Sequence, residues 1–347
     1  MKHEKELLST EQNVFLKINR GLDPYPVCIE LYPTDICNQK CQYCFHGGKG
    51  FGRERYEEKF MQLNDYVVLF KEMSRLNINI LSISGGGEPF LYKSILGVIN
   101  EAIKNGLEVR IVTNGSLIGV KAIDLLIKCK EIRFSVDTPD SKTYSVIRKV
   151  SEQLYEKVLD NISKLVKVKE KSNSDLNIGA SCIIGRNNVN QLTEFADLML
   201  DSLKIDTVVF KYDVYDKFSA DKKFQRVIAD QLRTIKDKYG KKAEIRGKLP
   251  KFEIGLPCVM SYFKCAVDPY GQLYSCCLAA QPKEKDGYKL GNIKDNIRKG
   301  YNNPLATVWK ESKNVRLSIL KRTVCNSCNF TDRNINSNYM EWSLFNK

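Results

Sequence analysis

The sequence contains no long hydrophobic run and nothing typical of an export signal. No apolar segment approaches the roughly 18 residues that a membrane-spanning helix needs. The segment Met1 to Arg20 is charged throughout and lacks the apolar core of a signal peptide. These absences exclude a membrane-spanning helix and secretion through a signal peptide. We therefore expect a cytoplasmic protein with no membrane partner.

Blocks of like charge and low-complexity segments are also missing. The 347 residues have a formal net charge of +14, from 55 Lys and Arg against 41 Asp and Glu, but the positive charges are scattered. Scattered lysines favour a solvated surface over a nucleic-acid interface, so nucleic acid is not the expected partner. A composition of 43% hydrophobic and 28% charged residues excludes disorder, collagen-like repeats and a pure coiled coil.

Cysteine, in contrast, is abundant, with twelve residues. Without an export signal, clustered thiols more often bind metal or carry out redox chemistry than form disulfides. Three cysteines lie within apolar runs, where we expect them to pack as small hydrophobic side chains: Cys28, Cys129 and Cys182. The other nine form three clusters: Cys37, Cys41 and Cys44; Cys258, Cys265, Cys276 and Cys277; and Cys325 with Cys328.

Short β-rich runs alternate with amphipathic helical patterns between residues 27 and 211. This alternation is typical of βα units around a parallel sheet. Six units are too few to close an eight-stranded barrel, so we expect an α/β fold, an open partial (β/α)6 TIM-like barrel with its site at the C-terminal strand ends. The six expected strands are Val27–Tyr32, Ile78–Ser84, Leu107–Val112, Glu131–Val136, Asn177–Ile184 and Thr207–Lys211.

The pattern changes after this region. A charged helical stretch at about 219–242 precedes a predicted hairpin, whose strands Tyr262–Val267 and Gln272–Cys276 flank a Pro-Tyr-Gly turn. The tail is short and rich in cysteine, which predicts a small β-hairpin/α domain held by a metal cluster. We expect four parts: an N-terminal extension 1–26, a partial barrel 27–218, a helical linker 219–249 and a cluster-binding domain 250–347.

The first cysteine cluster has the spacing C-x3-C-x2-C and follows the first predicted strand. Structural zinc normally has four protein ligands. Three local thiols therefore indicate an open metal site or an iron–sulfur cluster with one iron that lacks a protein ligand. His46 would complete a zinc set, which is the alternative.

This loop resembles that of the radical S-adenosylmethionine (SAM) superfamily, in which three cysteines follow the first strand of a partial barrel. The resemblance implies that Cys37, Cys41 and Cys44 hold a [4Fe–4S] cluster. The fourth iron of that cluster would bind SAM, and SAM would be cleaved to a 5′-deoxyadenosyl radical that abstracts hydrogen from a C–H bond. The resemblance also implies an electron donor of the flavodoxin or ferredoxin type.

A glycine-rich segment, Ser84 to Pro89, follows the second predicted strand and is similar to the GGE motif of the superfamily. A simple flexible turn or a phosphate-binding loop is the alternative, although no GK[ST] sequence follows. The resemblance implies that this backbone approaches the amino group of SAM. It also makes Arg148 the expected partner of the SAM carboxylate. The full set of expected SAM contacts is Tyr43, Gly86, Gly87, Glu88, Asn114, Ser135, Asp137, Arg148 and Ile184.

The tail has Cys258, twelve residues, Gly271, four residues and Cys276, followed by a later C-x2-C pair. This pattern resembles the SPASM and Twitch extensions, which hold auxiliary iron–sulfur clusters. No cysteine follows Cys328, so we expect the shorter Twitch form with one auxiliary [4Fe–4S] cluster, two clusters in all. A four-thiolate zinc site is the alternative. The implied ligands are Cys258, Cys276, Cys325 and Cys328.

Two tail cysteines remain without an assigned role. Cys265 lies in a hairpin strand, and Cys277 directly follows an expected ligand. Each fits a substitute ligand, a packed thiol or a catalytic hydrogen donor to a substrate radical. A hydrogen donor would separate epimerisation from oxidation.

These features predict a radical SAM oxidoreductase or epimerase. Only 36 residues precede Cys37, fewer than a leader-binding domain needs, which favours dehydrogenation or epimerisation of a sugar or aminocyclitol. A small-molecule substrate is thus expected, and a peptide substrate is the alternative. Two other classes stay open: a zinc-bearing nucleic-acid-binding protein, and an iron–sulfur protein that only transfers electrons.

Overall fold

The structure is a computed structural model. It describes residues 2–44, 59–212, 222–246, 258–277 and 288–321 and, near the C-terminus, 335–336, 338–339 and 343. For residues 2–10 and 222 the description is limited to the backbone.

All strands of the described residues belong to one ten-stranded sheet with the order β10-β9-β8-β1-β2-β3-β4-β5-β6-β7. Neighbours from β8 through β1 to β7 pair in parallel, whereas β9 pairs antiparallel with both β8 and β10. The strands are β1 (Cys28–Leu31), β2 (Ile80–Ile83), β3 (Glu108–Thr113), β4 (Glu131–Ser135), β5 (Asn177–Ile184), β6 (Thr207–Tyr212), β7 (Ala243–Arg246), β8 (Lys264–Val267), β9 (Gln272–Tyr274) and β10 (Lys289–Asn292).

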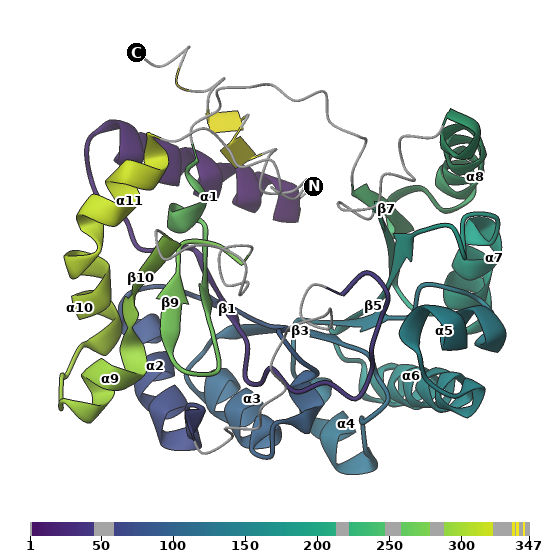
Figure 1. Ribbon diagram of the computed structural model, residues 1–347, viewed down its shortest axis with the longest axis horizontal. Coiled ribbons are helices and arrows are strands. Elements are labelled where there is room, and N and C mark those ends of the chain that lie inside the picture. The colour runs from purple at the N-terminus through teal and green to yellow at the C-terminus, as the bar shows by residue number, and fades with distance from the viewer. Residues whose placement is uncertain are drawn as a thin grey trace.

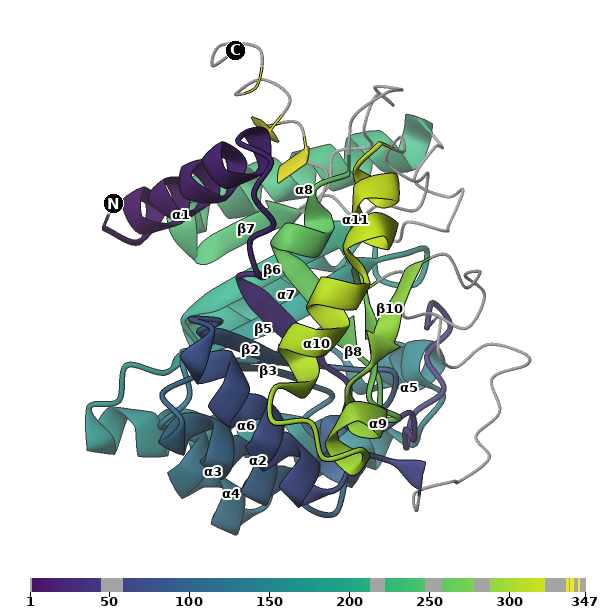
Figure 2. The same cartoon turned by 90° about the vertical axis from the view of Figure 1, so that its left-hand side faces the viewer.

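Helices α2 to α7 cover the outside of this curved sheet, and α1 crosses one of its ends (Figures 1 and 2). Short 3-10 segments (Pro89–Leu91, Gly240–Lys242, Met260–Tyr262) and a π-helical turn (Leu198–Ser202) complete the described elements. The helices are α1 (Lys2–Asn19), α2 (Leu63–Arg75), α3 (Ile95–Lys104), α4 (Val120–Leu126), α5 (Ser141–Arg148), α6 (Glu152–Ser172), α7 (Leu192–Asp197), α8 (Lys222–Tyr239), α9 (Ile293–Arg298), α10 (Pro304–Glu311) and α11 (Lys313–Leu320).

The two faces of the sheet differ in chemistry. In β4, Ile132 and Phe134 are fully buried in the hydrophobic core, while the alternate residues Glu131 and Arg133 are half-buried on the other side. We call the helix-covered side the outer face and the opposite side the inner face. Burial of one large apolar side chain contributes about 1.5–3 kcal/mol, so the outer face stabilises the fold. The inner face carries most of the charged side chains of the strands.

The expected partial barrel is confirmed, and the first six strands match their predicted positions within a few residues. Strand β7 was missed. It pairs in parallel with β6 inside the region expected to be a helical linker. The predicted hairpin forms as β8 and β9, but β8 also pairs in parallel with β1, so the hairpin continues the barrel sheet. The division of the chain into four parts stays a prediction.

The structure describes ten of the twelve cysteines. Cys129 and Cys182 are buried in the core, as expected. Cys28 differs, because it alternates with the buried Ile29 and lies on the inner face of β1. Its half-buried position is therefore not that of a core residue.

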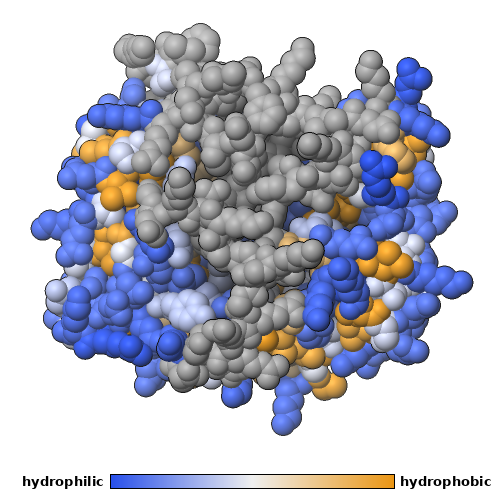
Figure 3. Space-filling model, viewed as in Figure 1, coloured by the Kyte–Doolittle hydropathy of each residue, from blue (hydrophilic) through white to orange (hydrophobic). Residues whose placement is uncertain are grey.

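The view in Figure 3 shows mostly hydrophilic side chains on the coloured surface, with hydrophobic ones in small, separate groups. None of the described helices is both long enough and apolar enough to cross a lipid bilayer.

Candidate active site

The glycine-rich turn after β2 holds one side of the cysteine loop. The Gly87 amide donates to the Thr34 carbonyl at 2.9 Å, and the Glu88 amide donates to the Ile36 carbonyl at 2.8 Å. A Cβ atom added to Gly87 would lie 2.1 Å from the Ile36 oxygen. Glycine at this position is therefore required for the two loops to pack together. The close approach of Gly87 is made to the cysteine loop, and the approach of this backbone to SAM that the resemblance implies stays a prediction.

The C-terminal end of α5 holds the other side of the loop. The Lys40 amide donates to the Arg148 carbonyl at 3.1 Å, and the Gln42 amide donates to the Ile147 carbonyl at 3.0 Å. Carbonyls in the last turn of a helix have no partner within the helix. The helix ends at Lys149, whose φ of 53° is left-handed. The loop thus satisfies the end of α5, and α5 fixes the loop.

Glu88 joins the ends of β2 and β3. Its side chain is 2% exposed and accepts hydrogen bonds from the Thr113 hydroxyl at 2.6 Å and the Asn114 amide at 2.7 Å. Burial raises the pKa of Glu88, and these hydrogen bonds oppose the shift. The Glu88 carboxylate therefore forms hydrogen bonds with other residues of the protein. Its expected contact with SAM stays a prediction.

Asn114 connects β3 to the cysteine loop. Its side-chain amide donates to Asn38 Oδ1 at 2.8 Å, and the Asn38 amide donates to the Ser116 hydroxyl at 2.9 Å. Ser116 in turn donates to Asn114 Oδ1 through its backbone at 2.9 Å and its hydroxyl at 2.7 Å. Sequence reasoning missed Asn38 and Ser116. Their only signal was that each lies one or two residues from an expected site residue.

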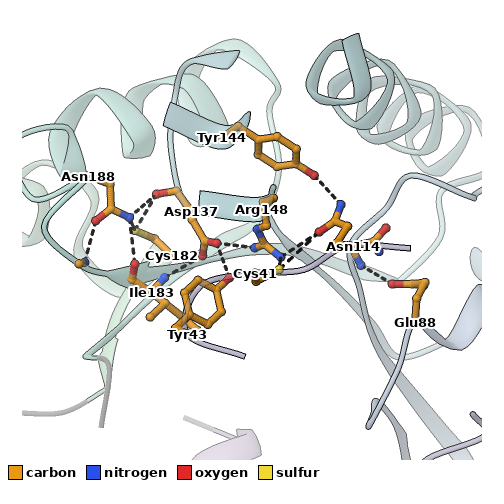
Figure 4. A network of polar contacts seen from close by, with 12 residues as sticks. Cys41, Tyr43, Glu88, Asn114, Asp137, Tyr144, Arg148, Cys182, Ile183 and Asn188 are labelled. Carbon is orange, nitrogen blue, oxygen red and sulfur yellow. Dashed lines mark hydrogen bonds and ion pairs between the residues drawn. The ribbon is translucent and has the colours of Figure 1, made fainter. Parts of the chain in front are cut away.

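Asp137 and Arg148 form a buried ion pair at the end of β4 (Figure 4). The two charged groups lie 2.5 Å apart, with side chains 0% and 4% exposed. The Asp137 carboxylate also accepts from the Ile183 amide at 2.9 Å and from the Tyr43 hydroxyl. Burial would lower the pKa of Arg148, but the Asp137 carboxylate outweighs it and holds that pKa well above its ordinary value. Three expected SAM contacts, Tyr43, Asp137 and Arg148, thus come together.

The same arginine reaches the cysteine loop. Arg148 Nη1 lies 3.5 Å from Cys41 Sγ and 3.4 Å from Gln39 Oε1. Its guanidinium also stands over the rings of Tyr43 and Tyr144, 5.6 and 5.8 Å from their centres. Burial raises the pKa of the Cys41 thiol, and the positive charge of Arg148 opposes this. Arg148 therefore places a fixed cation beside an expected cluster ligand.

Asn188 fastens the end of β5 to this network. Its side-chain amide donates to the carbonyls of Asp137 at 2.8 Å and Ile183 at 2.9 Å, and its oxygen accepts from the Gly185 amide at 2.8 Å. Asp137 has a left-handed φ of 76°, and these contacts hold it there. Sequence reasoning missed Asn188, because nothing in the local pattern separates it from an ordinary loop asparagine.

Two other expected SAM contacts lie apart from the network. Ser135 ends β4 on the half-buried inner face, and no role for its hydroxyl follows from its position. Ile184 is 2% exposed and packs in the core on the outer face. Its side chain therefore does not reach the inner face, and of the two isoleucines that end β5 only Ile183 does.

The tail cysteines are only partly described. Cys258 and Cys276 are half-buried and pack against the core, whereas Cys325, Cys328 and His46 lie outside the described residues. The auxiliary ligand set stays a prediction.

Cys265 does not fit the expected role of a hydrogen donor. It is 0% exposed, belongs to the outer-face core and donates its S–H to the Ser261 carbonyl at 3.2 Å. Burial also raises the pKa of its thiol. Of the roles expected for Cys265, the structure supports packing. Cys277 is half-buried, its carbonyl accepts from the Tyr32 hydroxyl at 3.3 Å, and its role stays a prediction.

The residue types around the first cysteine cluster fit an iron–sulfur cluster. Three thiols lie on one loop, and burial raises the pKa of Cys37 to about 11, opposed by a hydrogen bond from the Gln39 amide. Such thiols stay neutral near pH 7 until a metal displaces their protons. Within the described part of the chain, no three His, Cys, Asp or Glu side chains are gathered closely enough to hold a metal ion. The donor types, three thiols on one loop, fit the cluster.

One donor of Arg148 fits an anionic ligand. Its Nε is buried and has no hydrogen-bond partner among the described residues. Buried donors are rarely left unpaired, so this atom is available to an acceptor such as a carboxylate.

Comparison with known proteins places the chain in a family. The radical SAM superfamily model matches residues 31–198, and the model of an iron–sulfur cluster-binding domain, SPASM, matches residues 258–329. The chain is thus a radical SAM enzyme with a C-terminal SPASM domain, and it belongs to the radical SAM superfamily. Its cofactors are SAM and a [4Fe–4S] cluster. The zinc-bearing nucleic-acid-binding and simple electron-transfer alternatives are set aside.

Three relatives illustrate the similarity. The mycofactocin maturase MftC of Mycolicibacterium smegmatis is 26% identical over 312 residues, which cover 86% of this chain and 73% of that protein. The structure of Streptococcus suis SuiB superposes with a TM-score of 0.63 at 18% identity, over 89% of this chain and 71% of SuiB. The structure of anSMEcpe with bound AdoMet has a TM-score of 0.58 at 17% identity, over 92% and 98% of the two chains. The two structures show a shared fold.

Proposed function

We propose that this enzyme binds SAM beside Cys37, Cys41 and Cys44 and abstracts hydrogen from a C–H bond of a peptide substrate. The observation that carries the proposal is the continuous network from Asp137 through Arg148 to Cys41. It joins the expected cluster loop to the expected SAM-binding strand ends in one buried unit. When bound, the cluster supplies the electron that cleaves SAM to methionine and a 5′-deoxyadenosyl radical.

The residues of the chain position these groups. Arg148 holds a cation beside Cys41 and keeps Nε free for the SAM carboxylate. Asp137 fixes that arginine and is itself held by the Ile183 amide. Gly87 brings the glycine-rich turn against the cysteine loop. The polar network and the glycine-rich turn are therefore organised before the cofactor binds, which reduces the cost of ordering them.

A peptide substrate is supported by two relatives. MftC, which matches most of this chain, is named a maturase, and SuiB has been crystallised bound to the precursor peptide SuiA. Dehydrogenation or epimerisation of a sugar or aminocyclitol is the second candidate, and no observation of comparable weight favours it. An epimerase would need a hydrogen donor, for which Cys277 stays the candidate once Cys265 is placed in the core.

The test is anaerobic reconstitution with iron and sulfide, followed by reduction in the presence of SAM. Wild-type protein should form 5′-deoxyadenosine, and Cys41→Ala should form none because one cluster ligand is lost. Deuterated peptides should then be tested as substrates, and a peptide substrate should transfer deuterium into 5′-deoxyadenosine. Transfer from a deuterated aminocyclitol in place of the peptide would reject the peptide proposal. Absence of 5′-deoxyadenosine from cluster-loaded wild-type protein would reject the reaction itself.

A further inference from the structure

The inner face of strands β1 to β8 carries nine charged side chains, five cationic and four anionic. Most of them neutralise one another. Arg246 lies 2.6 Å from Glu244, and Lys264 lies 3.4 Å from Glu30. The ion pairs between described residues of these strands are Arg110 with Glu108, Arg133 with Glu131, Arg246 with Glu244 and Lys264 with Glu30.

Lys211 is the fifth cation and has no such partner. In the part of the chain that the structure describes, all four inner-face carboxylates are already paired with other residues. Lys211 lies on the inner face of β6, whereas Val208 and Phe210 of the same strand pack in the core on the outer face. Its neighbours in the sheet register are Ile183 on β5 and Arg246 on β7. Among the described residues of the inner face, one ammonium group is therefore left over.

The surroundings of Lys211 disfavour its charge. Burial lowers its pKa to about 8, and the nearby guanidinium groups of Arg133 and Arg246 act in the same direction. Asp137 and Glu30 oppose them and do not restore the ordinary value. A half-buried ammonium beside two guanidiniums gains more from an incoming anion than an exposed lysine does, because the local dielectric is lower.

The charge balance selects the kind of anion. On the described strands β1 to β8, five cations against four carboxylates leave one excess positive charge on the inner face. One carboxylate with a single negative charge neutralises it, whereas a phosphate dianion would leave an excess negative charge among four glutamates. We propose that Lys211 binds a carboxylate group of the substrate on the inner face of the barrel. This assignment deepens the proposed function, on which it rests for the identity of the substrate as a peptide.

The position of Lys211 relates that carboxylate to the reaction site. Lys211 pairs in register with Ile183, and the Ile183 amide donates to Asp137. Asp137 in turn holds Arg148 beside Cys41. A carboxylate on Lys211 therefore lies one strand away from the network that leads to the cysteine loop. Lys211 is a positioning residue, which anchors the acidic end of the substrate while another part of it reaches the radical.

Binding of two matched probes to the protein at pH 7 tests this assignment. N-acetyl-trialanine with a free C-terminal carboxylate should bind about tenfold more tightly than the same peptide with a C-terminal amide, the gain expected of a charge-assisted hydrogen bond. Isothermal titration calorimetry measures both affinities. Lys211→Met should remove the preference and Lys211→Arg should keep most of it. Since the pKa of Lys211 is about 8, the preference should fall as the pH rises above that value.

Lys264→Met is the matched control, because Lys264 is an inner-face lysine that already pairs with Glu30. It should leave the preference for the carboxylate probe unchanged. The assignment is overturned if wild-type protein binds the two probes equally or binds neither, or if Lys264→Met and Lys211→Met lose the preference alike. It is also overturned if Lys211→Met weakens the affinity for SAM in place of the probe, since the carboxylate bound would then be that of the cofactor.

Formation of 5′-deoxyadenosine in the absence of substrate measures the cleavage of SAM independently of binding at Lys211. Wild-type protein should show both this reaction and the preference for the carboxylate probe. If wild-type protein bound the carboxylate probe preferentially but formed no 5′-deoxyadenosine, the reaction would be rejected and the anion site would stand.

Discussion

At the scale of single residues, Arg148 connects more of the site than any sequence pattern indicated. It pairs with Asp137, stands beside Cys41 and covers two tyrosine rings, Tyr43 and Tyr144. Both members of the ion pair are buried, so neither is stable without the other. The structure thus gives Arg148 a role within the protein in addition to the expected one toward SAM.

Replacement of Arg148 should destabilise the folded protein. Arg148→Met leaves the Asp137 carboxylate buried without its counter-ion and should lower the free energy of unfolding by about 3–5 kcal/mol. Arg148→Lys retains the charge and should lose less. Urea unfolding of cluster-free protein measures both. Lys104→Met, which breaks an exposed pair with Glu101, is the control and should cost less than about 1 kcal/mol. Equal losses for Arg148→Met and the control would contradict the account.

Gly87 should tolerate no side chain. In Gly87→Ala the new Cβ would meet the Ile36 oxygen at 2.1 Å, which forces the two loops apart. We expect a loss of about 1–3 kcal/mol of stability and a loss of iron from the first cluster, measured by thermal unfolding and iron analysis. Gly119→Ala is the control, because no atom lies within 4 Å of its Cβ position. Full iron content in Gly87→Ala would contradict the packing argument.

At the scale of elements, the cysteine loop is held between the turn after β2 and the end of α5, and the hairpin is held by β1. Cys265 on β8 lies opposite Ile29 on β1, and both pack in the core. The pairing of β8 with β1 therefore fixes the face of the sheet on which the Cys265 side chain lies. A residue fixed in this way faces the helices and not the substrate.

Replacement of Cys265 should therefore affect stability and spare chemistry. Cys265→Ala removes one buried sulfur and should cost about 1 kcal/mol. Substrate turnover per iron-loaded protein should stay at the wild-type level. Chemical unfolding and a turnover assay with the deuterated substrate measure the two quantities. The opposite outcome, with unchanged stability and abolished turnover, would restore Cys265 as a hydrogen donor.

The first six strands could be predicted because each belongs to a regular alternation of strand and helix patterns. Strand β7 (Ala243–Arg246) could not, because it directly follows the charged helical segment of α8 and contains no run of apolar residues. The cysteine loop and glycine-rich turn were found from local spacing. The contacts of Asn38 with Asn114 and of Asn188 with Asp137 join residues 76 and 51 positions apart. The pairing of β8 with β1 joins residues more than 230 positions apart. Local sequence patterns do not indicate such contacts.

At the scale of the whole molecule, one sheet joins the part that matches the radical SAM superfamily to the part that matches SPASM. Because β8 continues the sheet from β1, the hairpin that precedes Cys276 has a fixed position relative to the cysteine loop. This arrangement suits a substrate that lies between two cluster sites. The number of auxiliary clusters is also a property of the whole molecule.

Iron content measures that number. Fully reconstituted wild-type protein should hold about eight irons, for one SAM-binding and one auxiliary four-iron cluster. Cys328→Ala should lower this to about four and should spare 5′-deoxyadenosine formation more than substrate turnover. About twelve irons in wild-type protein would show a second auxiliary cluster, and about four would remove the auxiliary cluster from the account.

The central claim is that one iron beside Cys37, Cys41 and Cys44 has no protein ligand and accepts SAM. Electron–nuclear double resonance on reduced, cluster-loaded protein tests this directly, with SAM that carries a heavy nitrogen isotope in its amino group. The account predicts a coupling between that nitrogen and the cluster in wild-type protein, and no coupling in Cys41→Ala. An intact first cluster whose spectrum is the same with and without SAM would contradict it, because all of its irons would then be bound by the protein.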